Sequence, residues 1–417
     1  MYMKYSFSFG LGLLFLVSSC GSNEKLLTVT VKNPINIERS REMVEIPLAD
    51  VLKTPSAKTA FKIVDEKKNE IAYQITHDNK VIFPISLQPK AESILYICEG
   101  KPSEVDTLVC GDMYPSRLDD VAWENDVVGF RVYGPALQKS GERGFGYDIF
   151  TKRDTTQPML KGMYELATSA ESARKLDELW KTDSKAAAAY SRAISYHVDK
   201  GHGMDCYGVG PTLGAGVAAL VDNGKIVYPW CYKTYEILDN GPLRFSVKFK
   251  YALGKFNGQE VTETRYITLD LGSYLNHTRV SYANVEENTP LVTGIVMHHP
   301  NKKASVNAEE GFMAYEDPTT GQNNGKIFVG HVFLGEVKDM AVEYFSPEEK
   351  KMRNNALGHA LSHSTYVPDR VFEYYWGAAW NKANDIKSLE AWQDYLKKYR
   401  VQLHNPLQVK FKGRKLR

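Results

Sequence analysis

The sequence predicts a mainly β protein: a small N-terminal β-sandwich, then a large antiparallel, supersandwich-like β-sandwich with helical insertions and a C-terminal helix. Two observations predict this class. Short segments with apolar residues at alternate positions recur along most of the chain, as in strands that bury one face. Stretches rich in good helix formers are few, which limits helices to insertions. A chain of 417 residues is long enough for two domains.

The first residues predict export and a lipid anchor. Lys4 precedes an apolar run that is too short to span a bilayer as a mature helix, and small residues follow it. This pattern is typical of a signal peptide, which we assign to residues 1–19. Val-Ser-Ser-Cys, ending at Cys20, resembles a bacterial lipobox, so we expect lipidation of Cys20 and a lipidated tether over residues 20–25. We therefore expect a lipid-anchored protein of the bacterial outer membrane that faces the periplasm or the cell surface.

Residues 26–110 are expected to form the small sandwich, because four short apolar or alternating runs are separated there by polar turns such as DEKKNE and HDNK. Residues 111–417 are expected to form the large sandwich. In its segment 244–251 alternate residues from Phe245 to Tyr251 are apolar and the others are polar. Helices are expected over 169–181, over 183–200, and after Ser388, which is a good N-cap.

The composition limits the partners. The net charge is only +2, which argues against a nucleic-acid binder. The chain has 25 Tyr, 17 Phe and 6 Trp, which suits polysaccharide or oligosaccharide ligands but equally suits packing in β-sheets. We expect a monomer without a cofactor, and a structural calcium ion stays open. After Cys20 the cysteines lack CxxC spacing, which disfavours zinc. Cys98–Cys110 with Cys206–Cys231 is one of three possible disulfide pairings, and free thiols are an equal alternative.

The segment GHGMDCYGVGPTLGAG, residues 201–216, is the first candidate for a catalytic loop. It follows a helical pattern and continues into Pro211, so it does not fit a phosphate-binding fingerprint. It does place His202, Asp205 and Tyr207 within six residues. β-Elimination from a uronic acid needs a base, an acid and a cation that stabilises the developing charge. We assign His202 and Tyr207 to proton transfer, with Asp205 beside them; a glycine-rich loop without catalysis is the alternative.

The cation in this scheme is expected to be Arg265, with Arg279 and Lys233 as alternatives. Arg265 and Glu263 share a strand face with apolar residues, so they form either a buried pair or the floor of a polar cleft. The adjacent His298 and His299 point to opposite strand faces, so at most one of them serves a given site. His359 and His363 have the i, i+4 spacing of a helical metal pair but lack the zinc-protease glutamate. We expect that pair to be solvated or to cap a helix.

A second candidate site lies in the run RLDDVAWENDVVGFRVYGPAL, which begins at Arg117. Two carboxylates on opposite sides of a sugar are the minimum for glycoside hydrolysis. Glu124 and Asp126, or Asp126 and Asp205, are the candidate pairs, and an acidic turn before a strand is the alternative. We assign Asp119 and Asp120 to such a turn. The residues expected to bind substrate are Trp123, Glu124, Asp126, Arg131, Tyr133, His197, Lys233, Arg279 and His298.

Three long motifs carry a family resemblance: DDVAWENDVVGFRVYGPAL, HVDKGHGMDCYGVGPTLGAG and YYWGAAWNKANDIKSLEAWQDYL. Together they resemble the lipoproteins of domain of unknown function 4861, over most of the chain from about residue 26. That family is found in glycan-utilisation gene clusters, so the resemblance implies a role in polysaccharide breakdown outside the cytoplasm. It implies no catalytic residue.

These observations favour a carbohydrate-active enzyme that cleaves uronic-acid-containing glycans by β-elimination, a polysaccharide or oligosaccharide lyase. A glycoside hydrolase with paired carboxylates is the second hypothesis. A non-catalytic glycan-binding lipoprotein is the third.

Overall fold

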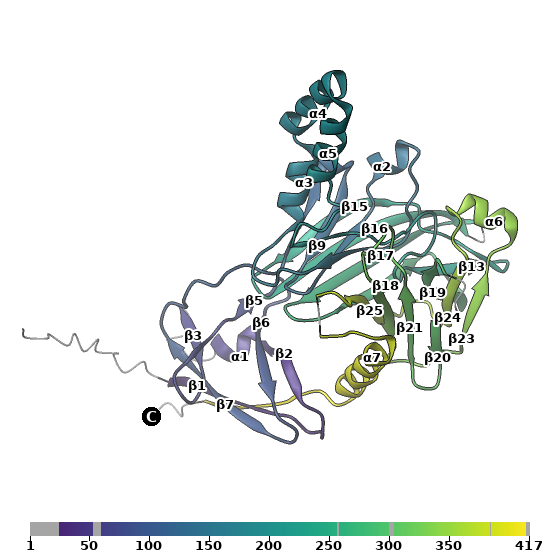
Figure 1. Ribbon diagram of the computed structural model, residues 1–417. Coiled ribbons are helices and arrows are strands. Elements are labelled where there is room, and N and C mark those ends of the chain that lie inside the picture. Colours follow the sequence, from purple (N-terminus) through teal and green to yellow (C-terminus); the bar gives the residue numbers. More distant parts are fainter. Residues whose placement is uncertain (1–24, 53–59, 257, 300–303, 384, 414–417) are drawn as a thin grey trace, which may run out of the picture.

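The computed structural model describes residues 25–52, 60–256, 258–299, 304–383 and 385–413. Strands dominate it, which confirms the predicted mainly β class with helical insertions and a C-terminal helix. The predicted signal peptide, Cys20 and all but the last residue of the predicted tether lie outside the described residues. Figure 1 shows the small sandwich at one end of the molecule and the larger assembly of sheets beside it.

The small sandwich consists of two sheets around one hydrophobic core. Alternate apolar side chains of its strands, such as Val29 and Val31 in β1, are buried in that core. β26 pairs antiparallel with β1, so the C-terminal segment returns to this sandwich although the sequence analysis assigned it to the large domain. One sheet has the order β26 (Gln408–Gly413), β1 (Lys25–Lys32), β7 (Glu92–Glu99), β3 (Phe61–Val64) and β4 (Glu70–Ile71), and the other has β2 (Arg39–Pro47), β6 (Lys80–Leu87) and β5 (Gln74–Ile75).

The large sandwich packs an eight-stranded antiparallel sheet against two five-stranded sheets through one continuous core. The eight strands are β15 (Tyr232–Asn240), β16 (Arg244–Phe256), β17 (Gln259–Asp270), β18 (Leu275–Ala283), β25 (Phe372–Trp380), β22 (Ile327–Val332), β21 (Phe312–Asp317) and β20 (Ala304–Asn307). The first five-stranded sheet has the order β12 (Gly203–Asp205), β11 (Asp148–Lys152), β10 (Val128–Val132), β9 (Asp120–Glu124) and β8 (Cys110–Tyr114). The second has β14 (Lys225–Ile226), β13 (Ala218–Asp222), β19 (Thr289–Met297), β24 (Gly358–Tyr366) and β23 (Asp339–Tyr344).

Helices cover outer faces of these sheets. The apolar stripe of α7 (Leu389–His404), with Trp392 and Leu396 buried, covers the outer face of the eight-stranded sheet, and Ser388 caps the helix as predicted. The inserted helices α3 (Leu160–Thr168), α4 (Ala170–Thr182) and α5 (Ser184–Ile194) project beyond the β8–β12 sheet (Figure 1), with α3 against its outer face. The remaining helical segments are α1 (Leu48–Leu52), η2 (Pro115–Arg117), α2 (Pro135–Lys139) and α6 (Pro347–Met352).

The expectation for His359 and His363 meets a different structure. His359 and His363 lie on strand β24, and His359 is buried, so the pair is neither helical nor solvated as a unit. Burial lowers the pKa of His359 to about 3, which keeps its imidazole neutral. Cys110, Cys206 and Cys231 are free thiols, so the free-thiol alternative holds for these three residues. In the part of the chain that the structure describes, no helix combines the length and the apolarity that a membrane span needs.

Candidate functional site

The glycine segment 201–216 runs through the interior of the large sandwich. Its first two residues are exposed, and nearly all of the others are buried. Side chains from distant strands hold its backbone: His331 bonds the carbonyl of Ala215 at 3.0 Å, and the Tyr374 hydroxyl donates to that of Gly216 at 2.8 Å. The glycines allow this close approach, because a Cβ at Gly216 would lie 2.4 Å from the His331 ring. The segment is therefore a buried connection and not an open surface loop.

The proton-transfer pair predicted from the sequence is not brought together. The His202 side chain is 47% exposed and lies 3.4 Å from the Asp154 carboxylate. Tyr207 is buried, and its hydroxyl has no hydrogen-bond partner among the described residues. The predicted clamp, Arg265, is fully buried in an ion pair with Glu263, so the buried-pair alternative holds for these two residues. No substrate carboxylate can reach that guanidinium in this structure.

The two alternative cations lie on other surfaces. Arg279 is exposed on the outer face of the eight-stranded sheet and lies 5.2 Å from the centre of the Tyr266 ring. Lys233 is exposed on the edge strand β15, with its ammonium 6.0 Å from the centre of the Trp230 ring. Arg265 points to the inner face of the same sheet, so the three cations do not share one site.

The outer face of the β8–β12 sheet carries a buried set of charged residues, which we call the polar face. Strand residues at alternate positions share a face, and the apolar alternates of these strands, such as Trp123 and Phe130, belong to the main core. The outer face, which is the polar face, is covered by α3 and Tyr196. Six ionisable residues of the polar face are at most 3% exposed: Asp120, Glu124, Arg131, Asp148, Lys152 and Asp205.

Arg131 is the centre of the polar face. Its guanidinium donates to Asp148 through Nε at 2.8 Å and to Asp205 at 2.9 Å, and it lies 3.7 Å from Asp120. The Tyr133 hydroxyl donates to Asp148 at 3.0 Å. One buried cation therefore faces three carboxyl groups, an arrangement in which the charges do not balance when all three are ionised.

This imbalance appears in the pKa values. Burial raises the pKa of Asp205 to about 6, and the neighbouring Asp148 charge adds to the shift. Burial likewise raises the pKa of Asp120 to about 6, although Arg131 and Arg117 oppose the shift. Two carboxyl groups thus titrate near neutral pH beside one guanidinium, and such perturbed groups are found preferentially at functional sites. Asp120, which the sequence analysis assigned to a turn, is part of this cluster.

The predicted hydrolase pair of Glu124 and Asp126 is divided between two environments. Glu124 accepts from Lys152 at 2.5 Å within the polar face and also accepts from the backbone at the start of α3. Asp126 bonds Arg41 of the small sandwich at 2.6 Å and the backbone of Gly272 at 2.6 Å. Each carboxylate has its own structural partners, so the pair does not face a common substrate position. Trp123, also predicted to bind substrate, is buried and donates to Asn276 at 2.9 Å.

Two imidazoles flank the segment 205–208: His197 lies beside Asp205, and His298 lies beside Gly208. The His197 side chain is 57% exposed, and its Nδ1 lies 3.1 Å from the Asp205 carbonyl oxygen and 3.5 Å from the carboxylate. At the other end, His298 Nδ1 bonds Asp317 at 2.7 Å. The Asp317 side chain is 2% exposed and that of His298 is 25% exposed. A buried carboxylate that orients a partly exposed imidazole is the arrangement of a general base.

The Tyr207 ring meets His298 edge to face, with 6.0 Å between ring centres. Gly208 permits the contact, because a Cβ there would lie 3.2 Å from His298 Nε2. Burial, and then the Asp317 charge, raise the pKa of Tyr207 far above its ordinary value, so the phenol stays protonated. The structure therefore pairs Tyr207 with His298, which the sequence analysis had placed among the substrate-binding residues, and not with His202.

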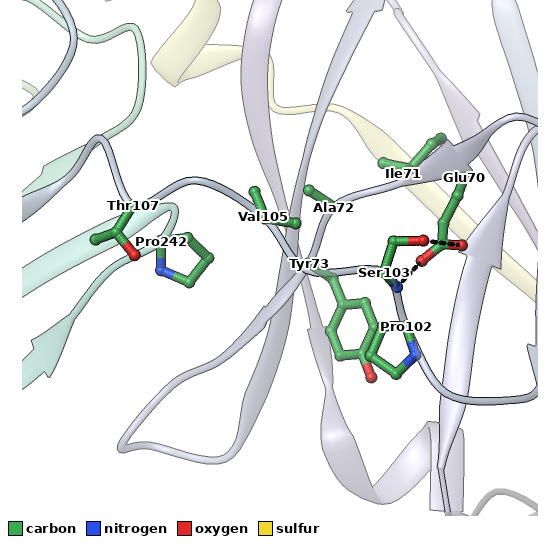
Figure 2. A pocket seen from close by; sticks show the side chains of 9 residues that line it. All are labelled: Glu70, Ile71, Ala72, Tyr73, Pro102, Ser103, Val105, Thr107 and Pro242. Carbon is green, nitrogen blue, oxygen red and sulfur yellow. Dashed lines mark hydrogen bonds between the residues drawn. The ribbon is translucent and has the colours of Figure 1, made fainter. Parts of the chain in front are cut away.

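A separate hollow of about 170 Å³ lies where the small sandwich meets the large one. Figure 2 shows Glu70 and Tyr73 on one side of it and Pro242 on another. Glu70 already accepts from the backbone and hydroxyl of Ser103, at 2.5 and 3.0 Å. The Tyr73 hydroxyl likewise donates to the carbonyl of Phe61 at 2.8 Å. Both groups already have structural partners, so we place the candidate site at the polar face and His298.

Sequence reasoning missed Asp148, Lys152 and Asp317. Asp148 and Lys152 occupy the two ends of a five-residue strand and share a face with its apolar middle residue, as Asp120 and Glu124 do in theirs. A charged residue at each end of two strands of one sheet was therefore the available signal. Asp317 ends a strand and carried no comparable signal. In the described part of the chain, no group of three His, Cys, Asp or Glu side chains could hold a metal ion.

A family model described as Domain of unknown function (DUF4861) matches residues 31–409. The chain belongs to this family. A curated relative of this DUF4861 chain, "Uncharacterized protein P7" of Formosa agariphila, is 25% identical over 413 residues, which cover 94% of this chain and 96% of the relative. The resemblance seen in the three sequence motifs is thereby confirmed.

Two solved structures are similar at low scores. One is an alpha-mannosidase from Enterococcus faecalis V583, with a TM-score of 0.45 and 9% identity. The other is a protein in the Glycosyl Hydrolase Family 38 from Enterococcus faecalis, with a TM-score of 0.44 and 9% identity. Each match covers 94% of this DUF4861 chain and 46% or 48% of the solved chain, so the chain spans about half the length of these structures.

Proposed function

We propose that this protein is a carbohydrate-active enzyme that cleaves uronic-acid-containing glycans by β-elimination, with His298 as the base. The observation that carries the proposal is the pairing of His298 with the buried Asp317 beside the protonated Tyr207. The family resemblance to lipoproteins of glycan-utilisation clusters supports a glycan substrate. We also propose that the protein works outside the cytoplasm, anchored through Cys20.

The reaction follows from the arrangement. His298 Nε2 removes the proton from the carbon next to the substrate carboxylate, and Asp317 holds Nδ1–H and stabilises the imidazolium that forms. A carbon–carbon double bond forms as the bond to the leaving glycosidic oxygen breaks, and that oxygen takes the phenolic proton of Tyr207. The Tyr207 hydroxyl is buried and has no hydrogen-bond partner among the described residues, so this role requires substrate binding to expose it.

The test is the appearance of ultraviolet absorbance from an unsaturated uronide when the protein is incubated with uronic-acid oligosaccharides. We expect H298A to lower the rate at least about 100-fold, because a general base typically contributes that much. D317N and Y207F should also lower it. H277A is the matched control: His277 also pairs with a carboxylate, Glu373, but lies on the outer face of the eight-stranded sheet, so the rate should not change.

Hydrolysis is the second candidate, because Asp205 and Asp120 both have a pKa of about 6 and could supply a general acid near neutral pH. It predicts new reducing ends without ultraviolet absorbance, and activity that D205N abolishes and H298A spares. Glycans that bind but are recovered uncut would contradict both enzymatic proposals and favour a glycan-binding lipoprotein.

A further inference from the structure

Four buried polar atoms without hydrogen-bond partners gather at the edge of the polar face. They are Arg117 Nε, Asp120 Oδ2, Arg131 NH1 and the Tyr164 hydroxyl, and we call them the Arg117 site. Asp120 Oδ2 lies 3.9 Å from Arg117 Nε and 3.7 Å from Arg131 NH1. These separations are too long for direct hydrogen bonds but suit one bridging oxygen atom. Buried polar groups are almost always paired, so this gathering calls for a partner.

We propose that the Arg117 site binds hydroxyl groups of a sugar, as a subsite of the glycan substrate; the inference rests on the proposed function. A hydroxyl oxygen accepts two hydrogen bonds and donates one. Arg117 Nε and Arg131 NH1 supply the two donors, and Asp120 Oδ2 supplies the acceptor. The second hydrogen of Arg131 NH1 and the Tyr164 hydroxyl remain for an adjacent hydroxyl of the same ring.

The charge at this site selects a neutral group over an anionic one. A carboxylate ligand could accept from both arginines, but it would leave Asp120 Oδ2 unpaired and would repel Asp120 whenever that group is ionised. The sugar hydroxyl is therefore the ligand group at neutral pH, and the uronate carboxylate belongs elsewhere on the substrate.

The Arg117 site borders side chains that are partly exposed. The Arg117 side chain is 15% exposed and lies 5.6 Å above the Tyr196 ring, next to the exposed His197. Arg117 and Asp120 flank Leu118 and Asp119, which both have positive φ, 59° and 67°. Such a conformation is uncommon for non-glycine residues and is found preferentially at ligand sites. This turn places Arg117 Nε and Asp120 Oδ2 on either side of the position proposed for the sugar hydroxyl.

Binding of a defined probe tests the inference. The probe is a mixture of oligosaccharides of about two to six residues released from a glucuronate-containing polysaccharide, titrated into the full protein under calorimetry or thermal denaturation. We expect Y164F to weaken binding about threefold to tenfold, since a neutral hydrogen bond is lost, and R117Q to weaken it more than tenfold, since a charged one is lost. Y190F is the matched control, because Tyr190 lies in the same insertion and bonds Ser172 at 3.4 Å instead.

Equal affinity of wild type, Y164F and R117Q would overturn the inference, as would absence of binding, which would mean that ordered water alone fills the site. Y164F removes a hydroxyl without a partner, so its unfolding without ligand should match that of the wild type and a folding defect is not expected to obscure the result. If H298A abolishes cleavage but Y164F leaves binding unchanged, the proposed function is retained and the subsite is rejected. If Y164F weakens binding of the oligosaccharides but the wild type never cuts them, the subsite is retained and the proposed function is rejected.

Discussion

Arg265 and Arg131 are both buried, but the surrounding structure uses them differently. Arg265 faces a single carboxylate, Glu263, and both side chains are completely enclosed in the main core. Arg131 faces three carboxyl groups, of which Asp148 and Asp205 bond it directly. Atoms without hydrogen-bond partners occur at both places, so they do not by themselves distinguish a site from a structural pair.

Charge balance and the exposure of neighbouring side chains distinguish the two regions. The rings of Tyr147 and Tyr251 surround Arg265, at 5.3 and 4.6 Å from its guanidinium carbon, and both residues are buried. In the Arg131 cluster, by contrast, Asp205 lies beside the exposed His197, and Asp120 lies beside the partly exposed Arg117. A buried charged residue therefore indicates function when the carboxyl groups around it can still titrate and when side chains next to it are exposed to solvent.

The largest expected effect is the loss of either guanidinium. We expect R265M and R131M each to lower the free energy of unfolding at pH 7 by about 3 to 5 kcal/mol, because each leaves buried carboxylates without their cation. Urea denaturation measures the loss. A loss below about 1 kcal/mol at either position would show that solvent reaches that carboxylate.

Double replacement should then separate the two regions. In E263L/R265M both ions are gone, so we expect the protein to recover at least about 2 kcal/mol relative to R265M alone. In R131M/D148L two carboxyl groups, Asp120 and Asp205, still lie around the lost cation, so recovery should be smaller. Equal recovery of the two double variants in urea would contradict the difference in charge balance.

The pH dependence of stability is the next effect. The pKa of Asp205 and of Asp120 is about 6 in the folded protein against an ordinary value of 3.8, so the folded state holds protons that the unfolded state releases. Their contribution is complete below pH 3.8 and is lost as pH rises through 6; from pH 7 to 5 each adds about 1 kcal/mol. His331 and His359 act oppositely. Burial lowers the pKa of each to about 3, so stability falls by about 2 kcal/mol for each between pH 7 and 5.

The acids therefore partly offset the histidines, and D205N should make the fall in stability from pH 7 to 5 steeper by about 1 kcal/mol. Urea midpoints at the two pH values measure this difference. D154N is the control: hydrogen bonds, first that from Thr156, lower the pKa of Asp154, so its contribution changes only at more acidic pH. An unchanged slope in D205N would place Asp205 outside the titrating cluster.

The smallest effect is expected at His197. H197A should change the free energy of unfolding by less than about 0.5 kcal/mol, because the side chain is largely exposed. The positive charge of His197 lowers the pKa of Asp205, so its removal should raise that pKa further. Carbon NMR of the Asp205 carboxyl during a pH titration measures the change. If H277A moved the Asp205 titration equally, the contact with His197 would not be its cause.

Local patterns predicted much of the fold. The alternation from Phe245 to Tyr251 gave the inward and outward faces of β16, and the Ser388 cap with the stripe at Trp392 gave α7. Arg131 and Asp205 were named individually from the sequence as candidates, but their contact joins residues 74 positions apart. The partnership of His298 with Asp317 likewise depends on how β19 and β21 lie beside each other, which no local pattern encodes.

The sequence by itself determined which residues alternate, where α4, α5 and α7 begin, and that histidines and acids concentrate around residues 197–207. Only the tertiary structure decided that the glycine segment lies inside the sandwich, that Arg265 is sealed beside Glu263, and that Asp120 belongs to a titrating cluster. Burial depends on which surface covers a strand face, and the covering α3 and the partner sheets come from distant parts of the chain. Because burial and neighbouring charge set the pKa of a group, the tertiary structure also decided the chemistry of these residues.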